Sequence, residues 1–94
     1  MKEYQISTNG RIRNVDGVMM KFFESLDGYK RVTLVNNGKH INHYIHLLVA
    51  KQFLIKGRGH VQVDHIDRNR KNNKVGNLRW VTLQEQNDNR VLNN

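Results

Sequence analysis

Hydrophobic positions divide the chain into a first half of short alternating segments and a second half that starts with a helical period. Asn-Gly and Asp-Gly pairs separate the early segments, and these residues supply the positive φ angles of two-residue hairpin turns. Apolar and polar side chains alternate through residues 29–35, as in a strand with one buried face. We therefore expect an antiparallel β-meander with strands at 4–7, 11–14, 18–23, 29–35 and 39–45.

At Ile45 the spacing of apolar residues changes from that of a strand to that of a helix. Apolar side chains then recur at helical spacing through Phe53, while Lys51 falls on the opposite side. This pattern predicts an amphipathic helix of about three turns that packs across the sheet and ends before Gly57.

Beyond this helix, residues 60–65 read as a strand and residues 77–81 as its antiparallel partner. A final helix should start at Thr82, because Thr82 and Glu85 have the spacing of a capping box. The fold class predicted is α+β. The 94 residues of the chain are enough for one small domain with a single core.

The amino-acid composition limits the binding partners and the metal sites that the chain can have. A net charge of +8 and a pI near 10.2 favour polyanionic partners, of which DNA and RNA are the most common. The chain has no cysteine, which excludes disulfides and thiolate zinc sites. Any metal must therefore bind oxygen and imidazole ligands, which points to a hard cation such as magnesium.

The sequence favours a cytoplasmic protein. No apolar run approaches the roughly 18 residues of a membrane span. The N-terminus also lacks the apolar region of a signal peptide.

The residues best suited to chemistry are Asp64 and His65. Hydrolysis of a phosphodiester needs a base, a cation that offsets phosphoryl charge, and groups that hold both. Asp64 is a hard oxygen ligand, and His65 is a base whose ordinary pKa lies near physiological pH. Side chains of adjacent strand residues point to opposite faces, so both can serve one site only if the strand ends or bends there. The polar loop that begins at Asp67 allows this.

Cationic side chains surround this segment. Those of the loop after Asp67 could belong to an ordinary solvated connection, but beside a metal they would meet phosphates, and we expect backbone contacts. Two further arginines leave one hairpin on the same face, and Arg79 faces solvent, an acidic partner or a phosphate. The predicted contacts are Arg11, Arg13, Arg68, Arg70, Lys71, Lys74 and Arg79.

Two other features favour structural roles. Trp80 alternates with Leu78 and is expected to be a core anchor, with base stacking as the alternative. His40, His43 and His46 have the spacing of a metal cluster, but they straddle the predicted strand-to-helix junction. Because they should not share a face there, we do not predict zinc binding.

Several segments together resemble HNH endonucleases of the phage and intron-homing type, whose ββα-metal core is two strands and a helix around one divalent ion. They are Val63-Asp64-His65-Ile66-Asp67, Asn69, Asn72-Asn73, Asn77-Leu78-Arg79-Trp80-Val81-Thr82 and Glu85. Upstream segments are similar to the small module that often precedes this core, namely 4–7 with 10–13, 28–29, 45–50 and Phe53. The resemblance implies one domain, 1–94, made of a DNA-contacting module at 1–56 and an HNH core without a zinc knuckle at 57–94.

The same resemblance implies roles for individual residues. Asp64 would bind the metal, His65 would be the general base, and Asn77 would orient His65 and tie down the loop. The last metal ligand is usually His or Asn, 22 residues after the Asp, where this chain has Gln86. Asn87 is of the expected type but lies about 100° further around the helix. Gln86 is the favoured metal ligand, and Asn87 is kept as the alternative.

Arg90 shares the helical face of Gln86 and joins the predicted nucleic-acid contacts.

The predicted function is therefore hydrolysis of double-stranded DNA with Mg²⁺, Mn²⁺ or another divalent cation, and one metal centre per chain suits nicking. The chain would act as a monomer or homodimer, in the host cytoplasm if a phage encodes it. Two alternatives remain. Gln86 is compatible with an HNH-fold DNA-binding protein that cleaves little or not at all, and a structured-RNA binder would have similar charge.

Overall fold

The computed structural model of the chain describes residues 3–85. It contains seven strands, one α-helix and one 3₁₀ turn within that range: β1 (Tyr4–Ile6), β2 (Ile12–Asn14), β3 (Phe22–Glu24), β4 (Lys30–Asn36), β5 (Lys39–Tyr44), α1 (Ile45–Phe53), β6 (Gln62–His65), η1 (Val75–Asn77) and β7 (Leu78–Val81). The strands form three antiparallel sheets, β1-β2, β3-β4-β5 and β6-β7. This arrangement is the predicted α+β class.

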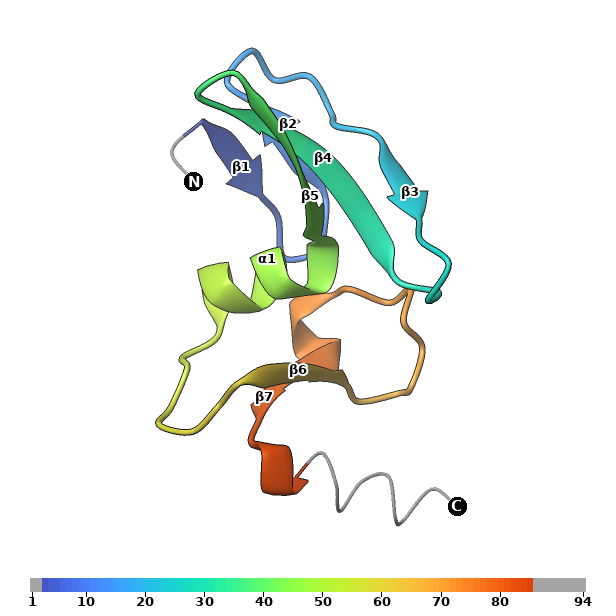
Figure 1. The fold of residues 1–94 in the computed structure, drawn as a ribbon, viewed down its shortest axis with the longest axis vertical. Coiled ribbons are helices and arrows are strands. Elements are labelled where there is room, and N and C mark those ends of the chain that lie inside the picture. The colour runs from blue at the N-terminus through green and yellow to red at the C-terminus, as the bar shows by residue number, and fades with distance from the viewer. Residues whose placement is uncertain (1–2, 86–94) are drawn as a thin grey trace.

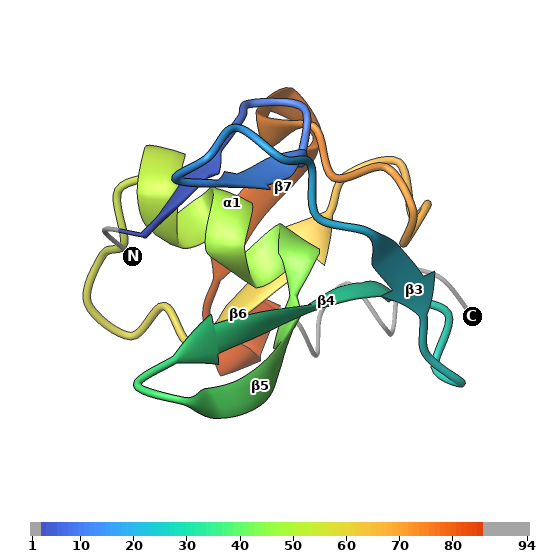
Figure 2. The ribbon, with the colours of Figure 1, turned by 90° about the horizontal axis from the view of Figure 1, so that it is seen from above.

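Helix α1 lies at the centre of the molecule. In Figure 1 the first five strands lie above it and the β6-β7 hairpin lies below. Seen from above in Figure 2, the β1-β2 hairpin and the β3-β4-β5 sheet lie on opposite sides of the helix. Helix α1 contacts β1, β4, β5, β6, β7 and η1. One helix therefore joins the N-terminal strands to the β6-β7 hairpin.

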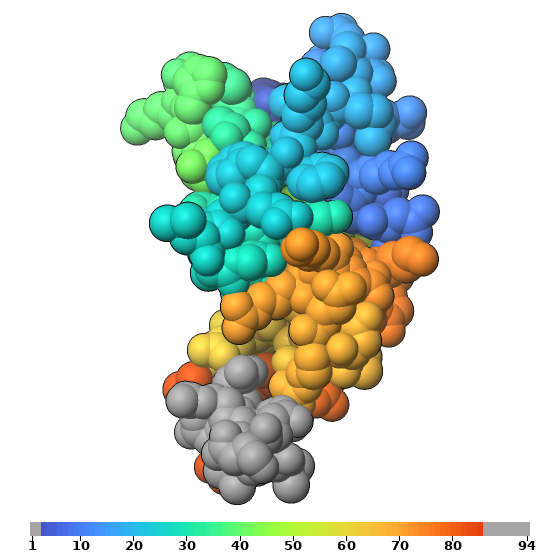
Figure 3. Space-filling view, turned by 90° about the vertical axis from the view of Figure 1, so that its right-hand side faces the viewer, coloured from blue at the N-terminus to red at the C-terminus, as the bar shows by residue number. Residues whose placement is uncertain are grey.

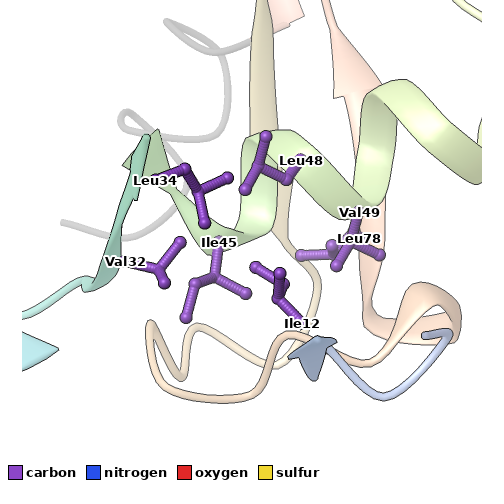
Figure 4. Packing of buried hydrophobic residues seen from close by; sticks show 7 residues of the cluster. All are labelled: Ile12, Val32, Leu34, Ile45, Leu48, Val49 and Leu78. Atoms are coloured by element: carbon purple, nitrogen blue, oxygen red, sulfur yellow. The ribbon is translucent and has the colours of Figure 1, made fainter. Parts of the chain in front are cut away.

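The core gathers around this helix. Its buried side chains come from β2, β4, α1 and β7, and Figure 4 shows them facing one another; they are Ile12, Val32, Leu34, Ile45, Leu48, Val49 and Leu78. Val32 and Leu34 alternate along β4 with the more exposed Thr33 and Val35. The predicted half-buried strand is therefore confirmed. Trp80 is buried as well, as expected for a core anchor.

The predicted single meander is wrong. β1 and β2 pair only with each other, and β3 starts a separate sheet. Between them, one isolated bridge joins Arg13 to Met19, and the predicted strand at 18–23 narrows to Phe22–Glu24. The physical reason is α1, because strands that must pack on two sides of one helix cannot remain in one flat sheet.

The start of the last helix matches its prediction. The Glu85 amide donates to Thr82 Oγ1 at 3.1 Å, and the Thr82 amide donates to Glu85 Oε1 at 3.1 Å. These two bonds are the reciprocal contacts of a capping box. Gln86, Asn87 and Arg90 lie outside the described residues. Among residues 3–85, no helix has the length and apolar character needed to cross a membrane.

Candidate active site

Asp64 and His65 meet in one polar pocket, although they are neighbours on a strand. β6 ends at His65, and a turn follows in which Arg68 adopts a positive φ of 66°. The pocket has a volume of about 240 Å³, and its lining includes Asp64, His65, Tyr29, Arg68 and Arg70. Asp64 is 8% exposed and His65 is 4% exposed. The end of the strand thus brings a carboxylate and an imidazole to one site, as the sequence required.

Asn73 fixes the imidazole of His65. The Nε2 atom of His65 lies 2.8 Å from Asn73 Oδ1, and Asn73 is 5% exposed. Because a carboxamide oxygen only accepts hydrogen bonds, Nε2 must carry the proton and donate it. The lone pair is then on Nδ1, which makes Nδ1 the atom that can accept a proton.

Asn77 holds the loop rather than His65 itself. Its Oδ1 accepts from the Asp67 amide at 3.0 Å, while its Nδ2 donates to Asp67 Oδ1 and to the Asn72 carbonyl, each at 2.9 Å. The expectation that Asn77 ties down the loop agrees with these bonds. Among the described contacts, however, the His65 ring is bonded by Asn73 and not by Asn77. Any effect of Asn77 on His65 is therefore indirect, through the path of the loop.

Asp67 is the centre of that loop. It accepts from the Asn69 amide at 2.8 Å and from Asn72 Nδ2 at 2.9 Å, besides its two bonds with Asn77. The hydrogen bond from Asn72, followed by those from Asn69 and Asn77, lowers the pKa of Asp67 below its ordinary value. The carboxylate therefore stays charged and keeps its bonds under ordinary conditions.

Two arginines surround the Asp64 carboxylate. Arg79 donates to Asp64 Oδ2 from Nη2 at 3.1 Å and from Nε at 3.3 Å. Arg68 Nη1 lies 3.8 Å from Oδ1. Both arginine side chains are about half exposed, and Arg68 also lines the pocket. Of the three partners expected for Arg79, namely solvent, an acidic residue or a phosphate, the structure shows an acidic residue, Asp64.

An aromatic cluster forms one wall beside His65. The rings of Tyr29, His46 and His65 contact one another, and Tyr44 contacts the first two. Burial, with a smaller effect of nearby His65, lowers the pKa of His46 from 6.5 to about 4. His46 is therefore neutral at physiological pH.

This cluster is anchored at Asp27. Tyr44 donates its hydroxyl to Asp27 Oδ2 at 2.8 Å, which raises the pKa of Tyr44. Hydrogen bonds from Ser25, then from Tyr44, lower the pKa of Asp27 to about 2. The first half of the chain thus supplies both a wall of the pocket and the charge that anchors it.

Asn73, Tyr29 and His46 were not predicted as site residues. Asn73 belongs to the polar loop that begins at Asp67, and nothing in its spacing tells it apart from Asn69 or Asn72. Tyr29 and His46 lie 36 and 19 positions before His65. Only the packing of α1 and the β3-β4 turn against β6 brings them to the site.

The loop cations divide into three groups. Arg68 and Arg70 line the pocket. Arg70 also lies over the Tyr29 ring at 4.8 Å and donates to the Asp27 carbonyl, while Lys71 pairs with Glu24 at 3.3 Å. Figure 3 shows this loop seated against the segment around β3. Lys74 is simply exposed.

Arg11 and Arg13 lie farther away, where they line one open groove of about 580 Å³ on the β1-β2 hairpin. Arg13 also donates to Gln5. Both side chains are exposed, so they remain available to a polyanion.

The donor chemistry of the pocket fits a hard cation. Among residues 3–85, no group of three or more His, Cys, Asp or Glu side chains is arranged to hold a metal ion. Magnesium nevertheless needs few protein ligands, since it retains waters and binds through one or two carboxylates plus substrate phosphates. Asp64 provides such a carboxylate in a polar pocket that Arg68 and Arg70 also line. An all-protein zinc site is not formed by these residues.

Comparison with protein families gives two matches. A model described as HNH endonuclease matches residues 43–88, and one described as the NUMOD4 motif matches residues 1–35. The HNH match thus includes α1 and the pocket residues from β6 onward. The division into parts at residue 56 stays a prediction.

Curated relatives agree with these matches. The chain is 39% identical over 80 residues to the DNA endonuclease I-HmuI of Bacillus phage SP01, in an alignment that covers 84% of this chain and 46% of that protein. It is 33% identical over 90 residues to the uncharacterized HNH endonuclease L245 of Acanthamoeba polyphaga mimivirus, which covers 96% of this chain and 27% of the relative.

A solved structure has the same fold. It describes DNA binding and cleavage by the HNH homing endonuclease I-HmuI, and it matches with a TM-score of 0.87 and 36% identity over 97% of this chain and 53% of that one. The chain therefore spans about half or less of these relatives. The matched families, the relatives and the fold agree, and they show that this chain carries an HNH endonuclease domain with a NUMOD4 motif ahead of it.

Proposed function

We propose that this chain is a divalent-metal-dependent DNA endonuclease in which His65 is the general base and Asp64 a metal ligand. The observation that supports this most is the shared pocket. It combines a carboxylate, an imidazole whose Nδ1 can accept a proton, and two arginines that can bind phosphate. These are the groups that metal-assisted phosphodiester hydrolysis requires.

The chain's residues have separate tasks in this reaction. His65 Nδ1 takes a proton from the water whose oxygen attacks phosphorus, while Asn73 holds Nε2. Arg68 and Arg70 bind the phosphate oxygens from the pocket rim. The bond from phosphorus to the 3′ oxygen breaks, the departing oxygen takes a proton from solvent, and the products are a 5′ phosphate and a 3′ hydroxyl.

HNH endonucleases generally depend on a divalent metal. We assign Mg²⁺ or Mn²⁺ to Asp64, with Gln86 or Asn87 as the expected second ligand. When bound, the ion offsets charge on the phosphate and on the departing oxygen. Arg79 would compete with such an ion for Asp64 Oδ2, and a phosphate is a suitable new partner for that guanidinium.

The proposed substrate is double-stranded DNA. I-HmuI is a DNA endonuclease, and its solved structure is described as one of DNA binding and cleavage. Exposed cations on the β1-β2 hairpin and in the loop after β6 support backbone contact along a duplex. One metal centre per chain suits nicking by a monomer, and a homodimer would be needed for a double-strand cut in one event. The proposed location is the cytoplasm, that of the host if a phage encodes the chain.

A supercoiled-plasmid assay tests the proposal. The purified chain is incubated with plasmid in Mg²⁺, in Mn²⁺ and in EDTA, and the open-circle product is quantified on a gel. Conversion with metal and none with EDTA is the expected result. Equal conversion in EDTA would contradict a metal-dependent reaction.

The second candidate is an HNH-fold DNA-binding protein that does not cleave. The observation that favours it is the pair of hydrogen bonds from Arg79 to Asp64 Oδ2, which occupies one oxygen of the proposed metal ligand. In that case the plasmid would be retarded in a salt-sensitive way, with no open circle in any metal.

A further inference from the structure

His46 packs directly against the proposed general base. It occupies the second position of α1 and is 7% exposed. Its ring centroid lies 4.9 Å from that of His65 and 4.9 Å from that of Tyr29, on which it stacks at an interplanar angle of 29°. Tyr29 and His65 are 5.7 Å apart. The three rings therefore form a mutually contacting triangle.

The other two rings of this triangle, Tyr29 and His65, are held by specific contacts as well as by packing. Arg70 lies over Tyr29 at 4.8 Å, and Tyr44 meets Tyr29 edge-on at 5.7 Å. His65 is bonded to Asn73. Since His46 belongs to the helix that organises the core, its ring is a rigid surface between two anchored groups.

His46 does not use its full hydrogen-bonding capacity. Its Nδ1 is buried and has no hydrogen-bond partner among the described residues. A buried polar nitrogen without a partner costs free energy. An aliphatic residue such as leucine would fill a purely structural position without that cost. What His46 offers instead is a flat, uncharged ring of imidazole size against His65.

We infer that His46 is a positioning residue for His65: beside Tyr29, its ring confines the His65 imidazole to the orientation in which Nε2 bonds to Asn73 and Nδ1 faces the incoming water. This inference rests on the proposed role of His65 as general base. The effect is one of geometry, because a loosely held base spends less time in the reactive arrangement.

The first test follows the His65 ring without any cleavage. Long-range ¹⁵N–¹H NMR at alkaline pH, where imidazoles are neutral, gives the population of each His65 tautomer. In the unmodified chain we expect the Nε2–H form. His46→Ala should give a mixture of both forms, and His46→Phe, which keeps a flat ring, should restore the Nε2–H form.

The second test is kinetic. Single-turnover cleavage of a duplex should slow by about 10- to 100-fold in His46→Ala, with KM for DNA unchanged. His46→Phe should return the rate to within about threefold of the original. Leu48→Ala is the matched control, since Leu48 is a buried residue of the same helix that belongs to the core cluster and not to the ring cluster. It should lower Tm and leave the rate of the folded protein unchanged.

The outcomes separate the two proposals. Unchanged tautomers in His46→Ala would overturn the positioning role, as would an equal rate loss in Leu48→Ala. A rate in His46→Phe as low as in His46→Ala would also overturn it, because the imidazole chemistry of His46 would then be required. Suppose that neither the unmodified protein nor any variant cleaves DNA, but that the His65 tautomers change as expected. The proposed function then fails, and the positioning of His65 stands.

Discussion

At the scale of single residues, two asparagines that look equivalent in the sequence have different contacts. Asn73 is bonded to the ring of His65, whereas Asn77 bonds Asp67 and the backbone of the loop. Both are carboxamides in a polar segment, so residue type and spacing alone could not separate them. The difference comes from the path of the loop, which brings position 73 back over β6.

This division predicts different consequences for the two asparagines. Asn73→Ala leaves the Nε2–H of His65 without its acceptor, so we expect cleavage to slow by about 10- to 100-fold with DNA affinity unchanged. Asn77→Ala removes three hydrogen bonds of the loop and should lower the free energy of unfolding by about 2–3 kcal/mol. Single-turnover rates and urea denaturation of both variants measure this. A larger rate loss in folded Asn77→Ala than in Asn73→Ala would contradict it.

Arg79 should compete with a metal for Asp64. Replacing it with alanine removes the two hydrogen bonds that Arg79 donates to Asp64 Oδ2, so the chain without DNA should bind Mn²⁺ a few-fold more tightly. The effect is modest because the Arg79 side chain is half exposed and screened by solvent. Electron paramagnetic resonance of free Mn²⁺ measures the affinity, and Arg13→Ala on the distant hairpin is the control. Unchanged or weaker Mn²⁺ binding in Arg79→Ala would contradict competition.

His46 should make stability depend on pH. Its pKa is 6.5 when unfolded and about 4 when folded, mainly because of burial, with His65 lowering it further and Asp27 opposing. Between these values the unfolded chain binds more protons, so the free energy of unfolding falls as the pH drops from 6.5 to 4. At about 1.4 kcal/mol for each tenfold change, the loss is on the order of 3 kcal/mol.

Urea denaturation across this pH range measures the loss. His46→Phe should lack this component, whereas His40→Phe, at an exposed position of β5, should keep it. The same slope in all three proteins would show that His46 is not the group responsible.

At the scale of elements, the sequence predicted what depends on local pattern. The alternation in β4, the helical period of α1 and the capping box at Thr82 each lie within a few residues, and each is present. The separation of the N-terminal strands into two sheets was not predictable in this way. It depends on α1, which follows them in the chain and takes one sheet on each side.

The loop between β1 and β2 also supports the site. Gly10 has a φ of 81°, and an added Cβ would lie 3.1 Å from Asn73 Cβ and 3.3 Å from the Asn73 carbonyl oxygen. Gly10→Ala should therefore strain the backbone and displace Asn73 from His65. We expect a loss of stability of about 1–2 kcal/mol from the left-handed backbone alone, with a further loss of cleavage rate.

Gly38→Ala is the control for this change. Gly38 has a φ of 78°, and nothing lies within 4 Å of an added Cβ. It should lose similar stability and keep the cleavage rate of the folded protein. Equal rates in the two folded variants, measured with melting curves on the same samples, would argue against support of Asn73 by Gly10.

At the scale of the whole molecule, the HNH region and the preceding strands together form the candidate active site. The aromatic wall beside His65 comes from residues 29–46, and Arg70 reaches back to the β3-β4 turn at Asp27. The sequence predicted Asp64 and His65 because they are adjacent and of the right chemistry. It could not predict Tyr29, His46 or Asn73, whose roles depend on long-range packing.

His65→Ala tests whether this structure cuts DNA at the proposed base. Cleavage of a labelled duplex in Mg²⁺ and affinity for the same duplex in EDTA are measured side by side for the unmodified chain and the variant. We expect affinity within about twofold, because His65 is buried, and a loss of cleavage of at least about 100-fold, as for removal of a general base. Cleavage by the variant at the original rate would contradict the assignment of His65 as the general base.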